Sequence, residues 1–338
     1  MTTWAAVVVF MAGGGVLVRV GSALAVAGDE LAEHTRLGRL LVGSLLIAFT
    51  TSLPEIATDV TAVVNDAPDL AVGDLFGSSM ANMAILAIVD LRHRGRVWPA
   101  VELGHARIAA VAIVLTAIAA LAMLTPPGAS LGWVGFDTMM IGGLYIAAMA
   151  WLRRAPVTPR AGTSAPIPLH EPIGLSRERP SSTLHRSAAR FALGAVGIFV
   201  TAPAVALSAK HLADASGIEQ TFVGTTLLAF TTSLPELIVA LAAVRIGAHD
   251  LAVGNLFGSN AANMTVLLIL DIAYVERPIL GAVDPAQATA AIGAILLMAL
   301  AIAAIVGGTE TRIRRLEPDA VVLLVAYLGA LTAVAFAT

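Results

Sequence analysis

Long apolar stretches alternate with short polar breaks along the whole chain. Each stretch holds about 20 residues, enough at 1.5 Å per residue for a helix to cross the roughly 30 Å hydrocarbon core of a bilayer. Ten such stretches lie at residues 3–27, 38–64, 69–91, 105–124, 131–152, 188–213, 218–244, 250–273, 286–307 and 317–337. The pattern therefore predicts an all-α polytopic membrane protein with ten transmembrane helices.

The amino-acid composition agrees with this interpretation. Of the 338 residues, 58% are hydrophobic and only 13% are charged, which is typical of a protein whose surroundings are mostly lipid bilayer. The chain has no cysteine, which excludes disulfides, thiolate metal sites and thiol catalysis. No basic residue precedes the first apolar run, so we expect that run to be a spanning helix and not a cleaved signal.

One long polar segment divides the chain. Residues 153–187 are rich in proline, serine and arginine and lack helical periodicity, so they are predicted to form a linker. Five apolar stretches precede it in residues 1–152, and five follow it in residues 188–338. Because five is an odd number of crossings, the second half enters the bilayer from the opposite side. We therefore expect two inverted five-helix repeats.

The basic residues are unevenly placed between the two sets of loops. If the N-terminus lies outside, the loops on the cytoplasmic side hold 17 of the 20 Lys and Arg residues. Short loops rich in Lys and Arg stay on the cytoplasmic side of a membrane. We therefore expect a multi-pass protein of the cell membrane, with both termini outside and the central linker, residues 153–187, in the cytoplasm.

A seven-residue string occurs twice. FTTSLPE occupies Phe49–Glu55 and returns at Phe230–Glu236, 181 residues later. Aligning residues 42–90 with 223–271 at this offset needs no gap, and about 29 of the 49 pairs are identical. Two copies kept only as packing units are the alternative, but packing does not call for a buried glutamate in each. Inverted repeats of this kind are typical of secondary transporters, with the site near the bilayer midplane.

The repeated string is rich in oxygen ligands. Pro54 and Pro235 have no N–H for the carbonyl four residues earlier, so each helix is predicted to be broken or kinked there. The oxygens come from the carbonyls of Thr50 and Thr231, the hydroxyls of Thr51, Ser52, Thr232 and Ser233, and the carboxylates of Glu55 and Glu236. Ca²⁺ takes six to eight oxygens, and two carboxylates balance its charge. Carbonyls and hydroxyls suit Na⁺ as well.

The second part of each repeat adds two polar pairs. Ser78 and Asn82 are four residues apart, and so are Ser259 and Asn263, which places each pair on one face of a helix. Their hydroxyl and amide oxygens can point at a shared ion, and we interpret them as candidate ligands. Hydrogen bonding between helices by small polar residues is the alternative.

Two acids break the symmetry of the repeats. Asp59 and Asp74 correspond to Ala240 and Asn255 in the second copy. Asp59 lies one turn beyond Glu55, and it is a candidate for an outer-shell ligand, an access-path carboxylate or a protonatable group. For Asp74, contact with an ion and a hydrogen bond between helices are both open.

Two further acids, Asp90 and Asp271, occupy matching positions at predicted helix ends. We expect both carboxylates to be solvated near a membrane interface. The seven histidines show no paired metal-ligand spacing, so none of them is assigned to a site.

These motifs resemble those of the cation/calcium exchanger family, whose two inverted repeats carry GTSLPE and GNxxGSN signatures. The chain has TTSLPE twice, with GDLFGSS at residues 73–79 and GNLFGSN at residues 254–260. It departs from the signatures at Thr50 and Thr231, which replace glycine, and at Asp74 and Ser79, which replace asparagine. The resemblance covers both repeats, roughly a third of the chain.

The resemblance implies a fold and a set of ligands. The second, third, seventh and eighth of ten helices would surround the ions, and the long first and sixth helices would slide past them. Glu55 and Glu236 would be the chief Ca²⁺ ligands, and Asn82 and Asn263 would take a central pair of positions where transporting prokaryotic members can carry an acid in one repeat. Flanking Na⁺ sites would be formed by Thr51, Ser52, Thr232, Ser233, Ser78 and Ser259.

The expected function is that of a secondary active cation antiporter that exchanges Ca²⁺ for Na⁺ by alternating access. The transported Ca²⁺ and Na⁺ are the expected bound ions, and no cofactor, nucleic acid or obligate protein partner is expected. The alternative of H⁺ or K⁺ as the driving ion is suggested by the missing central acid and by Asp59 and Asp74. A cation channel is a different class of function. The inverted repeats argue against it, and so does the charged site, which should hold an ion too tightly for rapid conduction. An enzyme is not expected, because paired-histidine and GxSxG motifs are absent from the sequence.

Overall fold

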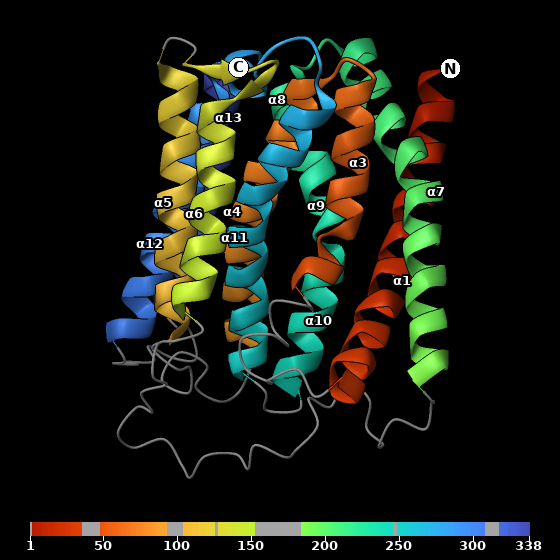
Figure 1. Ribbon diagram of the computed structural model, residues 1–338, viewed down its shortest axis with the longest axis vertical. Coiled ribbons are helices and arrows are strands. Elements are labelled where there is room, and N and C mark those ends of the chain that lie inside the picture. Colours follow the sequence, from red (N-terminus) through yellow and green to blue (C-terminus); the bar gives the residue numbers. More distant parts are fainter. Residues whose placement is uncertain are drawn as a thin grey trace.

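A computed structural model describes residues 2–35, 48–92, 104–125, 128–152, 184–245, 249–307 and 318–338. The described chain is mostly helical, and its long helices run side by side along one direction (Figure 1). Within these ranges, seven helices are long and apolar enough to cross a membrane, and eight if the bent pair Gln220–Thr232 and Leu234–Arg245 is one span. The prediction of a helical, polytopic membrane fold is confirmed.

The helices follow the predicted stretches closely. The first part of the chain forms α1 (Thr3–Thr35), α3 (Leu53–Val64), α4 (Pro68–Arg92), α5 (Gly104–Leu124) and α6 (Phe136–Leu152). The second part forms α7 (Leu184–Ser216), α8 (Gln220–Val223), the π-helix η2 (Gly224–Leu228), α9 (Ala229–Thr232), α10 (Leu234–Arg245), α11 (His249–Ala273), the 3₁₀ turn η3 (Ile279–Gly281), α12 (Gln287–Gly307) and α13 (Pro318–Ala337). Residues 38–47 of the second stretch and residues 153–183 of the predicted linker lie outside the described ranges.

Two helices begin at other residues than the hydropathy pattern indicates. The stretch at 131–152 begins with a hairpin of β1 (Ser130–Leu131) and β2 (Val134–Gly135), and α6 starts only at Phe136. Gly132 in the hairpin turn has φ = 64°, a conformation that favours glycine. The last four residues of the predicted linker, 184–187, belong to the first turn of α7. Hydropathy alone distinguishes neither an apolar turn from a helix nor a polar helix end from a linker.

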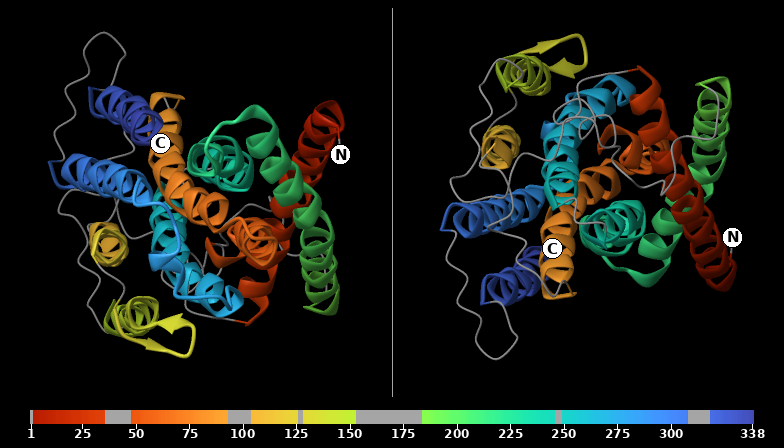
Figure 2. Two further views of the ribbon diagram at one scale, coloured as in Figure 1. Left: turned by 90° about the horizontal axis from the view of Figure 1, so that it is seen from above. Right: turned by 90° about the horizontal axis from the view of Figure 1, so that it is seen from below.

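Two helices form the centre of the molecule. The most apolar window of α4 is 94% buried and that of α11 is 72% buried, whereas the other long apolar helices are 22% to 50% buried. In both end-on views α4 and α11 lie between α1 and α7 on one side and α5, α6, α12 and α13 on the other (Figure 2). Helices α3 and α10 contact both central helices. The four central segments are thus the second, third, seventh and eighth of the predicted stretches.

Both copies of the repeated string interrupt a helix. In the first copy Ser52 lies in a turn, and α3 begins at Leu53 with Pro54 in its first turn. In the second copy α9 ends at Thr232, α10 begins at Leu234, and the two parts are bent by 43°. A proline lacks the N–H that would continue the ladder, so the break falls where the sequence predicts it.

Glycines let α4 approach the second copy very closely. A Cβ atom on Gly77 would lie 2.6 Å from the Cα of Thr225 and 2.7 Å from the Cβ of Ala229, distances that real Cβ atoms essentially never show. A Cβ on Gly73 would lie 2.8 Å from the carbonyl oxygen of Thr221. Only glycine fits at these crossings. The π-helix η2 lies at this contact, and such helices occur frequently at functional sites.

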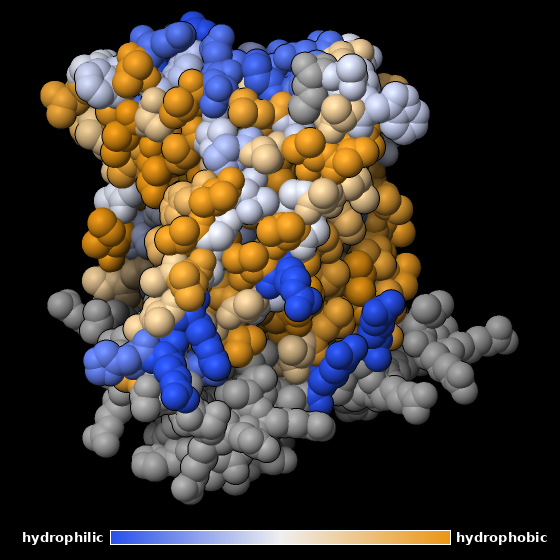
Figure 3. Space-filling model, turned by 90° about the vertical axis from the view of Figure 1, so that its right-hand side faces the viewer, coloured by the Kyte–Doolittle hydropathy of each residue, from blue (hydrophilic) through white to orange (hydrophobic). Residues whose placement is uncertain are grey.

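Helices α1 and α7 form a pair at one side of the molecule (Figure 2). Each is 33 residues long, and they cross where Gly194 of α7 packs against Leu24 of α1. Apolar side chains of the pair are widely exposed, among them Trp4 at 80% and Val200 at 73%. Figure 3 shows the resulting apolar belt between hydrophilic ends on this side. The belt is the surface that lipid would cover.

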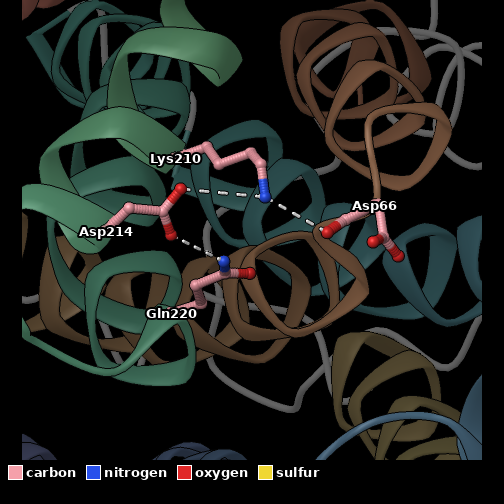
Figure 4. Close-up of polar contacts among 4 residues, drawn as sticks. All are labelled: Asp66, Lys210, Asp214 and Gln220. Carbon is pink, nitrogen blue, oxygen red and sulfur yellow. Dashed lines mark hydrogen bonds and ion pairs between the residues drawn. The ribbon is translucent and has the colours of Figure 1, made fainter.

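A small polar cluster fastens α7 to the core at the end where the chain termini lie (Figures 1 and 4). Lys210 Nζ donates to the carbonyl oxygen of Asp66 at 3.2 Å and lies 3.9 Å from a carboxylate oxygen of Asp214. Gln220 Nε2 donates to the other oxygen of Asp214 at 3.2 Å. Exposed ion pairs of this kind contribute about 1 kcal/mol or less. The cluster therefore contributes little to the stability of the contact between α7 and the core.

Candidate ion-binding site

The central helices bring all twelve predicted ligand residues into one buried region. Eleven of them are at most 1% exposed, and Thr231 is 9% exposed. They come from the helical residues 48–51, from the turns at positions 52 and 233, and from α3, α4, α9, α10 and α11: Thr50, Thr51, Ser52, Glu55, Ser78, Asn82, Thr231, Thr232, Ser233, Glu236, Ser259 and Asn263. The two further candidates, Asp59 and Asp74, are also fully buried.

The carboxylate of Glu55 is held by the second copy of the repeat. Ser233 Oγ donates to Glu55 Oε1 at 3.3 Å. With its amide oriented so that the nitrogen faces acceptors, Asn263 donates to Glu55 Oε2 at 3.1 Å and to the carbonyl oxygen of Ser259 at 3.1 Å. The structure therefore joins α3 to both α11 and the break between α9 and α10.

A second set of contacts surrounds Asp74. Thr232 Oγ1 donates to Asp74 Oδ1 at 3.0 Å, and Ser78 Oγ donates to the same oxygen at 3.5 Å. The hydroxyl oxygens of Ser78 and Thr232 are themselves 3.5 Å apart. Asp74 is thus part of a polar cluster to which both copies of the repeat contribute. Its Oδ1 accepts a hydrogen bond between helices, which is one of the two roles that the sequence left open for this residue.

Asparagines connect α4 and α11 at the centre. Asn82 Nδ2 donates to Asn260 Oδ1 at 2.8 Å, and Asn260 Nδ2 donates to the carbonyl oxygen of Ser79 at 3.2 Å. Ser79 and Asn260 are equivalent in the repeat alignment, so this contact joins matching positions of the two copies. Sequence reasoning missed Asn260, although the departure at Ser79 marked the position. Asn82 Oδ1 has no hydrogen-bond partner among the described residues.

Several buried oxygens in the cluster have no donor. Neither carboxylate oxygen of Glu236 has a hydrogen-bond partner in the described ranges, and neither does Ser259 Oγ. The buried polar residues of these ranges include no Lys or Arg. An ionised carboxylate without a partner is costly at such a depth, and a bound cation removes that cost. The site as described is therefore one that favours a cation.

The protein oxygens around such a cation would be mainly neutral ones. Among the described residues, no group of three or more His, Asp or Glu side chains is arranged to hold a metal ion. Hydroxyls, amides and backbone carbonyls must therefore complete the shell. Two of the predicted hydroxyls also bond to their own helix, Thr51 to the carbonyl of Ala48 at 3.1 Å and Thr232 to that of Leu228 at 3.1 Å.

The expectation of solvated carboxylates at Asp90 and Asp271 is wrong. Both are 0% exposed. Asp271 accepts from the backbone N–H of Gly135 and of Ile279, each at 2.7 Å, and from the hydroxyl of Thr138. It therefore anchors the β1–β2 hairpin to α11. Hydropathy does not reveal this partner, because the hairpin lies in a stretch with the apolar character of a helix.

Comparisons with known proteins agree with this geometry. The family model described as "Sodium/calcium exchanger protein" matches residues 5–152 and 186–336. An uncharacterised membrane protein of Methanocaldococcus jannaschii is 28% identical over 264 residues, which are 78% of this chain and 80% of the relative. The inner membrane protein YrbG of Escherichia coli is 29% identical over 278 residues, or 80% of each chain.

A solved structure shares the fold over nearly the whole length. The sodium-calcium exchanger NCX_Mj, soaked with Na⁺ and Sr²⁺, superposes with a TM-score of 0.62 at 21% identity, covering 98% of this chain and 99% of the other. The family match covers both parts of the sequence and agrees with this shared fold. The chain belongs to the sodium/calcium exchanger family.

Proposed function

We propose that the protein is a secondary active cation antiporter that exchanges Ca²⁺ for Na⁺ across the membrane by alternating access. One observation carries this proposal: Glu55 and Glu236 are both fully buried, Glu55 accepts a hydrogen bond from Ser233 in the second copy of the string, and no Lys or Arg is among the buried polar residues of the described ranges. Two carboxylates match the charge of Ca²⁺. The fold shared with a sodium-calcium exchanger soaked with Na⁺ and Sr²⁺ supports the choice of ions.

In this proposal Glu55 and Glu236 are the chief Ca²⁺ ligands. Hydroxyls and carbonyls on either side of them take Na⁺, and the amides Asn82 and Asn263 lie beside the centre. The flanking ligands are Thr50, Thr51, Ser52, Thr231, Thr232, Ser233, Ser78 and Ser259. Each carries only neutral oxygens, which is why these positions suit a monovalent ion better than Ca²⁺.

The proposed topology is ten crossings in two inverted halves, residues 1–152 and 188–338, with repeat cores 42–90 and 223–271. Both chain ends lie at the same end of the molecule, and the basic ends of α4 at Arg92 and of α10 at Arg245 lie at the other (Figure 1). Because Lys and Arg favour the cytoplasmic side, this placement supports a cell-membrane protein with both termini outside and a cytoplasmic linker at 153–187.

Alternating access is proposed to move the pair α1 and α7 past the four central helices. Gly21 of α1 packs against both prolines of the repeated string: a Cβ there would lie 2.9 Å from the ring of Pro235 and 3.4 Å from that of Pro54. Gly14 lies likewise against Thr231. A smooth, small-residue face over both breaks is suited to a sliding contact.

A different driving ion is the second candidate. The extra buried acids Asp59 and Asp74, together with amides at both Asn82 and Asn263, are the features that suggest H⁺ or K⁺ as the driving ion in place of Na⁺. A cation channel would use the same oxygens but would not need two conformations.

Flux measurements in proteoliposomes separate these functions. Vesicles loaded with Na⁺ and diluted into Na⁺-free buffer are expected to take up ⁴⁵Ca²⁺ against its gradient, and a Na⁺ ionophore should remove the uptake. K⁺ or pH gradients imposed without Na⁺ should drive none. Ca²⁺ uptake that follows the pH gradient in the absence of Na⁺ would show that H⁺ is the coupling ion. Large currents without a gradient of a second ion would indicate a channel.

A further inference from the structure

The first copy of the repeat holds two acids that the second copy lacks. Asp59 on α3 corresponds to Ala240 on α10, and Asp74 on α4 corresponds to Asn255 on α11. Both acids are 0% exposed. The pseudo-symmetry of the fold therefore does not require either carboxylate, since the equivalent places are filled by an apolar and a neutral side chain. A property that only the first half has must account for them.

The two carboxylates are neighbours. Asp59 and Asp74 are buried on α3 and α4, which pack against each other, and they are near enough for their charges to interact. Ionised carboxylates are acceptors only, so neither can satisfy the other. Thr232 and Ser78 donate to Asp74 Oδ1, whereas Asp74 Oδ2 and both oxygens of Asp59 have no hydrogen-bond partner among the described residues. Three buried carboxylate oxygens are thus left without a donor.

We propose that the Asp59–Asp74 pair is a second cation site, which binds one Na⁺ beside the central Ca²⁺ site. Two neighbouring buried carboxylates repel each other, and a positive charge between them turns that repulsion into attraction. Ca²⁺ needs six to eight oxygens, more than three free carboxylate oxygens at a fully buried place supply. A monovalent ion of the hard, oxygen-seeking class matches the site better.

This inference rests on the proposed antiport and adds one ion to it. Asp59 lies one helical turn after Glu55, toward the C-terminal end of α3 at Val64. Thr232, whose hydroxyl donates to Asp74, is itself one of the proposed flanking Na⁺ ligands. The two sites are therefore linked, and we expect the pair to raise by one the number of Na⁺ bound by the carrier.

The second copy of the repeat supplies the test variants. Asp59→Ala and Asp74→Asn install the residues that the equivalent positions already hold, so the fold has room for both. The number of ²²Na⁺ ions bound at saturation by purified, detergent-solubilised protein is expected to fall by one per chain in each variant. The double variant should lose no more than that one ion, because both acids serve one site. Asp319→Asn, which removes a charge from the first turn of the peripheral α13, should leave the count unchanged.

The outcomes distinguish this inference from the function on which it rests. Wild-type protein that binds no ²²Na⁺ would overturn both. Wild-type protein that binds Na⁺, with the same saturating number in Asp59→Ala and Asp74→Asn variants of unchanged unfolding temperature, would overturn the second site alone. An unchanged Na⁺ count together with a changed number of protons taken up by the variants would overturn it as well, and would assign the pair to a shared proton instead.

Discussion

Replacing Glu236 with Gln is expected to lower Na⁺-driven Ca²⁺ uptake to about 1% of the wild-type rate or less. The variant keeps the shape of the side chain but removes one of two charges that balance Ca²⁺. Removing one partner of a buried ion pair costs about 3–5 kcal/mol, which corresponds to at least two orders of magnitude in affinity. Initial rates of ⁴⁵Ca²⁺ uptake into proteoliposomes measure the effect. Glu219→Gln, at an exposed acid outside the site, is the matched control and should transport normally.

The same variant is expected to stabilise the protein when no ion is bound. Neither oxygen of Glu236 has a donor in the described structure, so the amide relieves an unpaired buried charge. Glu55 accepts hydrogen bonds from Ser233 and Asn263, so Glu55→Gln should raise the stability of the ion-free protein by less than Glu236→Gln does. The temperature of unfolding in Ca²⁺-free and Na⁺-free detergent checks this order. Intact Ca²⁺ flux in both variants would contradict the site assignment.

Gly21→Leu is expected to slow transport about tenfold or more while leaving the ion ligands in place. A side chain at Gly21 collides with the ring of Pro235 and meets that of Pro54, so α1 cannot keep its present position over the two breaks. Overpacking of this kind costs about 1–3 kcal/mol, and a shift of 1.4 kcal/mol between two conformations is tenfold in their populations. The rate of Ca²⁺ uptake measures it.

Gly15→Leu is the control for this helix, because a Cβ there meets nothing within 4 Å. We expect Gly15→Leu to transport at a rate close to wild type. Equilibrium ⁴⁵Ca²⁺ binding should persist in the Gly21→Leu variant. Its persistence would show that the slower transport comes from an impaired movement of α1 and not from loss of Ca²⁺ binding. Unaltered transport by Gly21→Leu would show that α1 does not move against the prolines.

The gross architecture follows from the sequence because hydropathy and repetition report on it directly. Segments of about 20 apolar residues must be helices in lipid, and the prolines of the repeated string lack an N–H wherever they stand. The break at Ser52 and the 43° bend at Ser233 therefore fall where the sequence predicts them. The burial of Glu55 and Glu236 follows from the same pattern.

The finer structure depends on how helices rotate and cross, which the sequence does not report. The offset of 181 aligns Ser79 with Asn260 but does not say that they touch. The π-helix at 224–228 packs against Gly73 and Gly77, a contact between segments distant in the sequence. The burial of Asp271 escapes prediction because its partner, the hairpin at 130–135, has the hydropathy of a helix.

The pairing of Asp59 with Asp74 is of the same kind. Each acid is visible in the sequence as a departure from symmetry, but their proximity arises only when α3 packs on α4. A comparison of the two copies nevertheless marks both positions. An internal repeat thus shows which residues are unusual, whereas the packing of the helices decides what those residues touch.

The central claim is that the two copies of the repeat hold one Ca²⁺ between them. The most direct measurement is the position of the ion in crystals of the protein soaked with Ca²⁺, located by anomalous scattering. We expect one strong peak with carboxylate oxygens of both Glu55 and Glu236 within about 2.3–2.6 Å. A Ca²⁺ ion bound to only one of these glutamates, or away from both, would contradict the claim.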